Sequence, residues 1–220
     1  MEYKITKFFN DEELKVINDS LVNAVWKDGI DTTSSVGIHN MERNKKNFQT
    51  TINSNFLFDI IDTNNDFLDF TLPKYSEEPI ISKTPTGGYY KPHFDYCELG
   101  HFSTTIFLND PKTYDGGELC LYFNNTEEKI KLDPGYGIIY ETGTPHRVNT
   151  VTKGERLVYI FWTTSKIPVM EDLCRYRYYI DLSKKHQIID KIQHKCKDFA
   201  DDLGVHFQEK AYKIRRKYLT

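Results

Sequence analysis

The feature that most constrains the fold is a change of pattern after Pro79. From there to about residue 163, short segments rich in Ile, Tyr, Phe, Thr and Val are separated by turn sequences such as Thr86-Gly87-Gly88. This rhythm is typical of an antiparallel sandwich or jelly roll, and not of strands that alternate with helices. We therefore predict eight strands, at residues 79–84, 89–96, 102–108, 118–123, 127–132, 136–140, 146–151 and 155–163.

Helical patterns flank this β region on both sides. Asn10 and the three acidic residues after it are a helix start. Apolar residues then recur at helical spacing up to Trp26, and Asp28-Gly29 would end this helix. Residues 30–47 are polar and are expected to form a loop. Three further helical periods are expected, at residues 52–61, 67–70 and 168–199.

Together these patterns predict one mainly β domain of the α+β class over residues 1–220. Its parts would be an N-terminal helical support (1–78), a jelly-roll core (79–165) and a C-terminal helical segment (166–220). The sequence shows neither internal repeats nor a low-complexity linker that would divide it.

Composition excludes several classes of protein. The chain has 220 residues, 14% of them aromatic, and its mean hydropathy is −0.59; together these values argue against both a membrane protein and a disordered one. The longest wholly apolar run, Leu157 to Trp162, is far too short to span a bilayer. Lys and Arg number 29 against 32 Asp and Glu, a net charge of −3. The chain is therefore not a generally basic nucleic-acid binder, and we assign it neither a membrane nor a nucleic-acid partner.

The cysteines indicate a reducing compartment. Cys97, Cys120, Cys174 and Cys196 form no C-x-x-C pair, which excludes a zinc ribbon or a thioredoxin-like motif. The first residues also lack the apolar stretch of a signal peptide. We therefore expect reduced thiols and a cytoplasmic protein.

His93-Phe94-Asp95 is the first candidate for chemistry. On a strand, residues two apart project from the same face, so the imidazole and the carboxylate would point together into the barrel. The pair alone is weak evidence for a metal site, because seven histidines and 32 acidic residues give about one pair of this spacing by chance. Taken singly, a surface pair or a polar core pair is the better explanation.

Two later residues strengthen the case. His146 follows a Gly-Thr-Pro turn at the start of a predicted strand, and two His with one carboxylate are the facial ligand set of non-haem Fe(II). Arg156 begins another predicted strand, and its guanidinium can hold a carboxylate in fork geometry, such as the far end of 2-oxoglutarate. The simpler alternatives are that Arg156 pairs with Glu155 or Glu141 at the surface, and that His146 caps a strand end.

Further motifs extend over nearly the whole chain. They are Trp26-x-Asp28-Gly29, Lys46-Asn47-x-Gln49, Asp110-Pro-x-x-Tyr114-Asp115-Gly116-Gly117-Glu118-Leu119, His146-Arg147-Val148, Val151-x-x-Gly154-x-Arg156, Phe161-Trp162 and Ile214-Arg215-Arg216-Lys217-Tyr218. In these motifs the sequence resembles the PKHD-type hydroxylases, which are bacterial and phage-type relatives of the prolyl 4-hydroxylases among the Fe(II)/2-oxoglutarate dioxygenases.

The resemblance implies a fold, cofactors and roles. It implies a double-stranded β-helix with iron ligands at His93, Asp95 and His146, and Arg156 on the C5 carboxylate of 2-oxoglutarate. The cofactors would be Fe(II), 2-oxoglutarate as cosubstrate and O2, and ascorbate (vitamin C) commonly keeps the iron of such enzymes ferrous. A prolyl residue in a protein or peptide is the leading substrate, with succinate and CO2 as coproducts.

One departure concerns the cosubstrate. Animal-type prolyl hydroxylases have Tyr-Leu-Asn on the third core strand, where this chain has Phe107-Leu108-Asn109. The lost phenol could have bonded 2-oxoglutarate, so Ser103 or Thr105, on the same strand face, are candidates to replace it. Tyr90 and Trp162 are candidates to wall the substrate pocket, with plain core packing as the simpler explanation.

Other functions stay open. The substrate could be a free amino acid, a siderophore or another small metabolite. A cupin-like metal enzyme without a 2-oxo acid would be expected to carry an H-x-H pair, which is absent, and a non-catalytic metal-binding β-roll is a further alternative. Residues 184–220 hold ten Lys and Arg against five Asp and Glu, which suits an acidic or RNA-associated partner but is more often a solvated helical face.

Overall fold

The computed structural model describes residues 3–32, 44–52, 58–59, 61–123, 125–193 and 197–219, with backbone alone for 187–193 and 197–203. The chain divides into two compact units, Met1–Thr164 and Ser165–Thr220. Each unit is described by itself, and the single domain expected over residues 1–220 stays a prediction.

The first unit is built mainly from antiparallel strands. Its strands are β1 (Tyr3–Lys7), β2 (Lys27–Asp28), β3 (Lys45–Lys46), β4 (Phe48–Thr50), β5 (Pro73–Ser76), β6 (Ile80–Pro85), β7 (Tyr89–His93), β8 (Phe102–Phe107), β9 (Asp115–Gly116), β10 (Leu119–Phe123), β11 (Thr126–Ile130), β12 (Tyr136–Glu141), β13 (His146–Val148), β14 (Val151–Lys153) and β15 (Glu155–Ser165). In the described residues its helices are α1 (Asp11–Leu21) and α3 (Asn65–Thr71), with short 3-10 turns η1 (Gly29–Thr32), η3 (Cys97–Leu99) and η4 (Pro111–Thr113).

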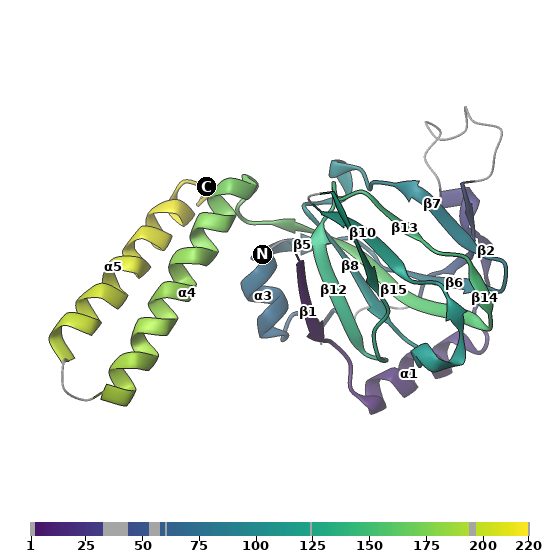
Figure 1. Ribbon diagram of the computed structural model, residues 1–220, viewed down its shortest axis with the longest axis horizontal. Coiled ribbons are helices and arrows are strands. Elements are labelled where there is room, and N and C mark those ends of the chain that lie inside the picture. Colours follow the sequence, from purple (N-terminus) through teal and green to yellow (C-terminus); the bar gives the residue numbers. More distant parts are fainter. Residues whose placement is uncertain are drawn as a thin grey trace. The chain divides into compact units, whose positions relative to one another are not determined.

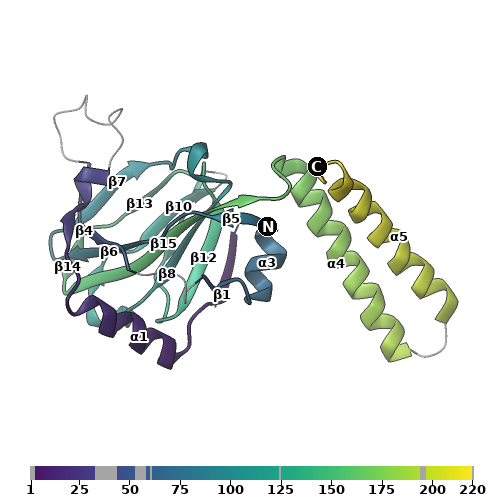
Figure 2. The same ribbon diagram turned by 180° about the vertical axis from the view of Figure 1, so that it is seen from behind.

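The strands form two main sheets, visible in Figures 1 and 2. The large sheet has eight strands in the order β1-β12-β8-β15-β6-β4-β2, with β5 added beside β15. The small sheet has five strands in the order β11-β10-β13-β7-β3, and β14 pairs with β9 separately. This architecture confirms the predicted mainly β, jelly-roll class with flanking helices.

The strand β15 shows how the large sheet is covered on both faces. Side chains alternate along a strand, so Tyr159 and Phe161 point to one face, where their rings contact Phe9 and Phe67 at centroid distances of 5.8 Å. Phe67 belongs to α3, which lies beside β1 (Figure 1). Residues of the opposite parity, beginning with Arg156, therefore face the small sheet.

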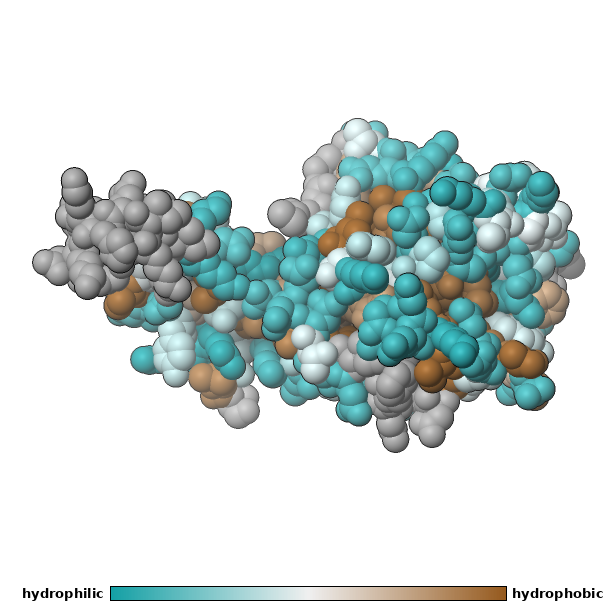
Figure 3. Space-filling view, turned by 90° about the horizontal axis from the view of Figure 1, so that it is seen from below, coloured by the Kyte–Doolittle hydropathy of each residue, from teal (hydrophilic) through white to brown (hydrophobic). Residues whose placement is uncertain are grey.

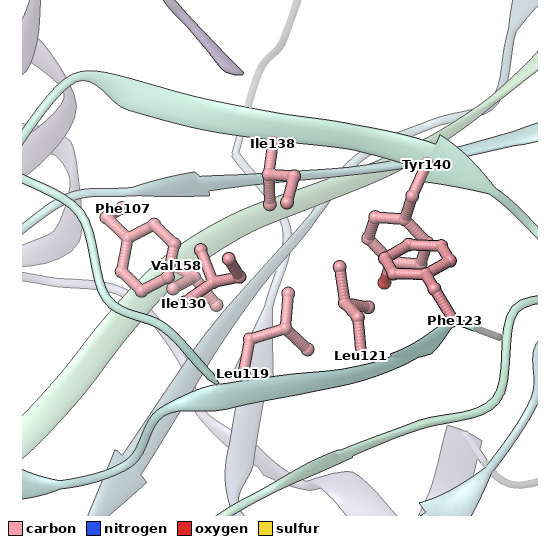
Figure 4. Packing of buried hydrophobic residues seen from close by; sticks show 8 residues of the cluster. All are labelled: Phe107, Leu119, Leu121, Phe123, Ile130, Ile138, Tyr140 and Val158. Atoms are coloured by element: carbon pink, nitrogen blue, oxygen red, sulfur yellow. The ribbon is translucent and has the colours of Figure 1, made fainter. Parts of the chain in front are cut away.

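An apolar core fills part of the space between the sheets (Figure 4). The small sheet contributes side chains from β10 and β11, and the large sheet contributes side chains from β8, β12 and β15. The cluster consists of Phe107, Leu119, Leu121, Phe123, Ile130, Ile138, Tyr140 and Val158. This close packing fixes the spacing of the sheets, and the functional cavity lies between them as well.

The first helix is shorter than the sequence predicted. Asn10 caps α1 as expected, because its side chain accepts a hydrogen bond from the Glu13 backbone N–H at 3.0 Å. The helix ends at Leu21 and not at Trp26, so the predicted end was wrong. Val22 and Val25 are 78% and 77% exposed, so continuing the helix would bury no further apolar surface.

Several strand boundaries also differ from the prediction. The strand expected over 89–96 ends at His93, and that expected over 146–151 divides into β13 and β14. The N-terminal strand β1 was missed, because it is a short edge strand whose pairing partner, β12, lies far along the sequence. The loop expected over 30–47 contains β3, and residues 33–43 lie outside the description. The helix expected over 52–61 also lies largely outside the described residues, whereas that near 67–70 is present as α3.

The second unit is a pair of helices, α4 (Met170–Gln193) and α5 (Lys197–Arg216). The helical character predicted for 168–199 is therefore confirmed, although it is divided between the two helices. They lie side by side (Figure 1). The Asp172 carboxylate accepts hydrogen bonds from the Tyr218 hydroxyl at 2.6 Å and the Lys217 ammonium at 3.1 Å. Part of the basic, aromatic C-terminal stretch thus joins the end of the chain to the start of α4.

The distribution of apolar residues on the surface agrees with the low mean hydropathy of the sequence. On the face shown in Figure 3, apolar residues form separate patches among hydrophilic ones. None of the helices in the described part of the chain is long and apolar enough to cross a membrane. Cys97, Cys120 and Cys174 are free thiols, as expected, and Cys196 lies outside the described residues.

Candidate active site

Three side chains that the sequence singled out meet at one point between the sheets. His93 is the last residue of β7 and His146 the first of β13, and the two are paired neighbours across the small sheet. Asp95 follows in the irregular segment after β7, not on the strand itself as predicted. One ligand atom from each of the three residues lies within 4.8 Å of the other two.

Both imidazoles present a free nitrogen to the same place. The Nδ1 atom of His93 lies 2.8 Å from the Lys91 carbonyl oxygen, and Nδ1 of His146 lies 2.9 Å from the Thr144 carbonyl oxygen. A carbonyl only accepts hydrogen bonds, so each Nδ1 carries a proton, and in the neutral ring Nε2 then keeps its lone pair. Both Nε2 atoms lie 3.9 Å from the same oxygen, Oδ1 of Asp95.

The other carboxylate oxygen of Asp95 accepts hydrogen bonds from the protein itself. Its Oδ2 accepts hydrogen bonds from the Ser103 hydroxyl at 2.8 Å and from the Trp162 indole N–H at 2.9 Å. The carboxylate is thereby oriented, with Oδ1 toward the imidazoles. Two neutral imidazole nitrogens and one carboxylate oxygen are the donor set that suits a ferrous ion with open positions, so these residues fit the metal.

The surroundings keep His93 in its metal-binding form. Burial lowers the pKa of His93 well below its ordinary value, and the neighbouring imidazole of His146 lowers it further. The neutral ring is the form that binds metal. Tyr90, predicted to wall the pocket, stacks on the His93 ring with centroids 3.5 Å apart. Burial also raises the pKa of Tyr90 to about 12, so its phenol is protonated at neutral pH.

A cavity of about 760 Å³ surrounds these residues. Arg156 of β15 lines it and is only 2% exposed. Among the residues that the structure describes, no carboxylate forms an ion pair with Arg156, so the surface pairing with Glu155 or Glu141 does not occur there. Its Nε atom is buried with no hydrogen-bond partner. A buried, unneutralised guanidinium beside a cavity is suited to bind the carboxylate of a ligand.

Asn109, of the Phe107-Leu108-Asn109 segment, and Gly117, of the Asp115-Gly116-Gly117 motif, hold the backbone and stem of Arg156. The Asn109 side chain donates to the Glu155 carbonyl at 2.8 Å and accepts from the Leu157 N–H at 2.9 Å, so it fixes the chain on both sides of the arginine. Gly117 has a φ of +69°, and a Cβ there would lie 3.3 Å from Cδ of Arg156 and 2.9 Å from a Val151 methyl. Only glycine accommodates both this conformation and this close approach.

The structure also shows where the other candidates lie. Thr105 lines the cavity, whereas the Ser103 hydroxyl is bonded to Asp95. Trp162 lines the cavity and bonds the same carboxylate. Arg147 points elsewhere, since its guanidinium bonds the Tyr122 hydroxyl and the Glu127 carboxylate.

Tyr140 and Lys45 are among the cavity residues that sequence reasoning did not single out. Tyr140, on β12, is fully buried, and its phenol interacts electrostatically with both Asp95 and Arg156. Burial raises the pKa of this phenol far above its ordinary value. A phenol thus lies in the cavity even though position 107 is Phe. Lys45 directly precedes the Lys46-Asn47-x-Gln49 motif, and its proximity to that motif was the only signal.

Comparison with known proteins identifies the family. Residues 80–164 match the model of the 2OG-Fe(II) oxygenase superfamily. A PKHD-type hydroxylase of Prochlorococcus marinus is 34% identical over 181 residues, covering 78% of this chain and 82% of that protein. The chain belongs to the PKHD-type hydroxylases. A second family member, from Sphingopyxis alaskensis, is 31% identical and covers 76% of this chain and 80% of that protein.

Solved structures with low identity share the fold of this PKHD-type hydroxylase. A prolyl hydroxylase from Trichoplax adhaerens, solved with a peptide fragment of hypoxia inducible factor, aligns with a TM-score of 0.59 at 15% identity, covering 75% of this chain and 84% of that chain. A viral collagen prolyl hydroxylase from Paramecium Bursaria Chlorella virus-1 aligns with a TM-score of 0.51 at 21% identity, covering 74% and 95%. The expected double-stranded β-helix core is confirmed. The family makes the chain an Fe(II)- and 2-oxoglutarate-dependent dioxygenase that uses O2.

Proposed function

We propose that His93, Asp95 and His146 hold the ferrous ion and that Arg156 binds the C5 carboxylate of 2-oxoglutarate. The observation that carries this proposal is the arrangement of one cavity, in which a ready facial ligand set and a buried, unneutralised guanidinium both face the same space. When bound there, the ferrous ion with O2 and 2-oxoglutarate supplies the oxidising chemistry that hydroxylates the substrate and releases succinate and CO2.

The protein's own groups position and shield these ligands. Ser103 and Trp162 orient Asp95, and the backbone carbonyls of Lys91 and Thr144 fix the imidazole tautomers. The phenol of Tyr140 and the hydroxyl of Thr105 are proposed as additional donors for the distal carboxylate. The buried walls reduce access of water, which strengthens each of these polar contacts.

We infer that the substrate is a prolyl residue in a protein or peptide. The support is that structural neighbours with the same fold are prolyl hydroxylases, one of them solved with a peptide fragment. A free amino acid, a siderophore or another small metabolite is the second candidate. The proposed compartment is the cytoplasm, and the support is that the described cysteines, Cys97, Cys120 and Cys174, are free thiols.

The experiment combines two measurements on the Fe(II)-loaded protein. Succinate formation from 2-oxoglutarate tests the dioxygenase chemistry, and mass spectrometry of proline-containing peptides and of small metabolites tests for the gain of one oxygen atom. Fragmentation then shows whether the oxygen lies on proline. Leaving out ascorbate tests our further proposal that it sustains turnover by keeping iron ferrous. Absence of succinate with every substrate, from protein that binds the metal, would contradict the proposed function.

A further inference from the structure

We propose that Phe94, Tyr96 and Glu98 form a subsite at the mouth of the cavity, which binds a basic side chain of the substrate beside the residue that is hydroxylated. This inference rests on the proposed function and specifies its substrate class, a peptide with lysine or arginine next to the hydroxylated residue. The chemistry recognised is an organic cation on an apolar stem.

The first observation is where the cavity opens to water. Of the residues that line it, Phe94, Tyr96 and Glu98 are exposed, and all the others are buried or half-buried. The lysine and the arginine of the lining, Lys45 and Arg156, are 3% and 2% exposed. Phe94, Tyr96 and Glu98 therefore mark the mouth of the cavity.

The second observation is how the chain presents these residues. Side chains alternate along an extended segment. His93 and Asp95 turn toward each other at the proposed metal site, which leaves Phe94 and Tyr96 to project from the other side of the same segment. Their rings form a T-shaped pair with centroids 6.2 Å apart. Glu98 follows in the short turn η3. The mouth is thus built directly onto the segment that carries two of the proposed iron ligands.

The third observation is that this segment is held in place while its aromatic rings stay in water. The Asp95 carboxylate is bonded to Ser103 and Trp162, and the Leu99 N–H donates to the Tyr96 carbonyl at 3.1 Å. The two rings of the mouth are nevertheless 60% and 44% exposed. A ligand that covers them gains apolar burial, and little conformational freedom is lost because the segment is already fixed.

The charge at the mouth indicates the kind of ligand. Glu98 is the only charged residue of the lining that is exposed. The Cys97 thiol lies 3.6 Å from its carboxylate, and no lysine, arginine or histidine of the described chain forms an ion pair with it.

A basic side chain matches both features of the mouth. Aromatic faces attract cations, and a carboxylate beside them adds an ion pair. The stem of lysine or arginine packs on apolar surface while its charged head stays near water. An acidic ligand would be repelled by Glu98, and a purely apolar one would use the rings alone. The combination therefore favours a cation.

The test uses pairs of peptides that differ in charge. Protein loaded with Mn(II), an inert substitute for Fe(II), and saturated with 2-oxoglutarate is titrated with N-acetyl-lysyl-prolinamide, and separately with the same peptide acetylated on the lysine Nζ. Broadening of the peptide's proton NMR signals by Mn(II) reports binding close to the metal. We expect the charged peptide to bind about fivefold or more tightly, as for an exposed cation–π contact combined with a surface ion pair.

A second pair shows on which side of proline the cation lies. N-acetyl-prolyl-lysinamide and its acetylated counterpart place lysine after proline. Preference for the charged peptide in either pair supports the inference, and the pair that shows it gives the order of the two residues. Peptides with norleucine in place of lysine keep an apolar stem without the charge, and they should bind more weakly than the lysyl peptides.

Variants assign the preference to the mouth. Glu98→Gln and Phe94→Leu should each reduce the preference for the charged peptide at least twofold. Glu12→Gln and Phe48→Leu are the matched controls, because they alter exposed residues that do not line the cavity, and they should retain the full preference. Titration with Mn(II) checks that each variant still holds the metal. If Phe94→Leu does not, Tyr96→Leu takes its place.

Three results would overturn the inference. The first is equal binding of charged and neutral peptides in both pairs, including no binding of any peptide. The second is a norleucyl peptide that binds as tightly as the lysyl one. The third is a preference that Glu98→Gln or the aromatic variant retains in full. Succinate formation from 2-oxoglutarate tests the iron chemistry separately, so a protein that forms succinate but does not prefer the charged peptides contradicts the mouth subsite alone.

Discussion

The two sheets that enclose the cavity contribute to it in different ways. The small sheet brings His93 and His146 from the ends of short strands, where the ladder is irregular and backbone carbonyls are free to bond the rings. The large sheet brings Arg156 and Trp162 from β15, an eleven-residue strand covered on both faces. The proposed metal ligands thus lie where the backbone bends, and the proposed anchoring cation, Arg156, lies on a long strand that is covered on both faces.

This difference predicts that substitutions in the two sheets impair different steps, metal binding in one case and cosubstrate binding in the other. Loss of a small-sheet imidazole should remove the metal and everything that depends on it. Loss of a large-sheet side chain should have a smaller effect on the metal. Removing Trp162 should weaken metal binding in part, and removing Arg156 should leave the metal bound and weaken 2-oxoglutarate binding. The variants below test this separation, beginning with the largest expected effect.

His146→Ala should abolish turnover and release the metal. Two remaining ligands cannot hold a labile divalent ion in facial geometry, so the loss of Mn(II) affinity should exceed the roughly 100-fold that loss of an outer hydrogen-bond partner costs. Titration with Mn(II) measures it. His101→Ala, which alters a histidine outside the cluster, should bind Mn(II) like the unmodified protein. Unchanged affinity in His146→Ala would remove this residue from the site.

Arg156→Ala should weaken 2-oxoglutarate but leave the metal bound. Losing a charge-assisted, bidentate contact in a poorly solvated pocket costs roughly 2–5 kcal/mol, or about 30-fold to several-thousand-fold. Arg156→Lys should restore only part of this, because an ammonium lacks the planar fork. The dependence of succinate formation on 2-oxoglutarate concentration measures the loss.

The matched control for Arg156 is Arg147→Ala. Arg147 is next to His146 in sequence, but its guanidinium is bonded to Tyr122 and Glu127. Its removal should leave the 2-oxoglutarate dependence nearly unchanged. If the two variants behaved alike, the proposed anchoring role of Arg156 would be wrong.

Trp162→Phe should have an intermediate effect. Phe keeps an aromatic wall but removes the N–H that bonds Asp95 Oδ2. Losses of such outer partners typically cost about 10- to 100-fold in metal affinity or activity. Ser103→Ala removes the other donor to the same oxygen, so the double variant should lose more than either single one. Metal titration of all three checks this, and a fully active double variant would contradict it.

Tyr140→Phe should have the smallest effect. The change removes one hydroxyl near Arg156, and a typical hydrogen bond contributes about 1 kcal/mol, or roughly fivefold in 2-oxoglutarate affinity. Tyr159→Phe is the control. Tyr159 is also buried, but it lies on the face of β15 opposite to Arg156, where its ring contacts Phe9. Equal 2-oxoglutarate affinities in the two variants would exclude Tyr140 from the cosubstrate site.

Much of the β core could be predicted from sequence because its signals are local. Short segments rich in Ile, Tyr, Phe, Thr and Val, most of them bounded by glycine or proline turns, marked all eight predicted strands, and the structure has a strand in each of these places. Strands such as β1 and β3 were missed because they are short and are defined only by distant partners. The end of α1 was misplaced because Val25 has helical spacing but no surface to pack against.

Prediction of the candidate site was limited in the same way, because contacts between distant residues are not visible in the sequence. His93, Asp95, His146 and Arg156 could be selected because spacing and resemblance agreed on them, and the structure brings all four to one cavity. Tyr140 could not, because the face on which a strand residue lies depends on how the sheets pack. The strand predicted through Asp95 was wrong for a related reason. Its carboxylate must turn toward Ser103 and Trp162, contacts that lie 8 and 67 residues away in the sequence.

The central claim is that one cavity binds a ferrous ion through the small sheet and a 2-oxo acid through the large sheet. Anaerobic titration of 2-oxoglutarate into the Fe(II)-loaded protein tests this most directly, because a 2-oxo acid chelated to ferrous iron gives a visible charge-transfer absorption. We predict a band that saturates at one 2-oxoglutarate per iron, requires far more 2-oxoglutarate in Arg156→Ala, and is absent in His146→Ala. Iron binding without any such band in the unmodified protein would contradict the account.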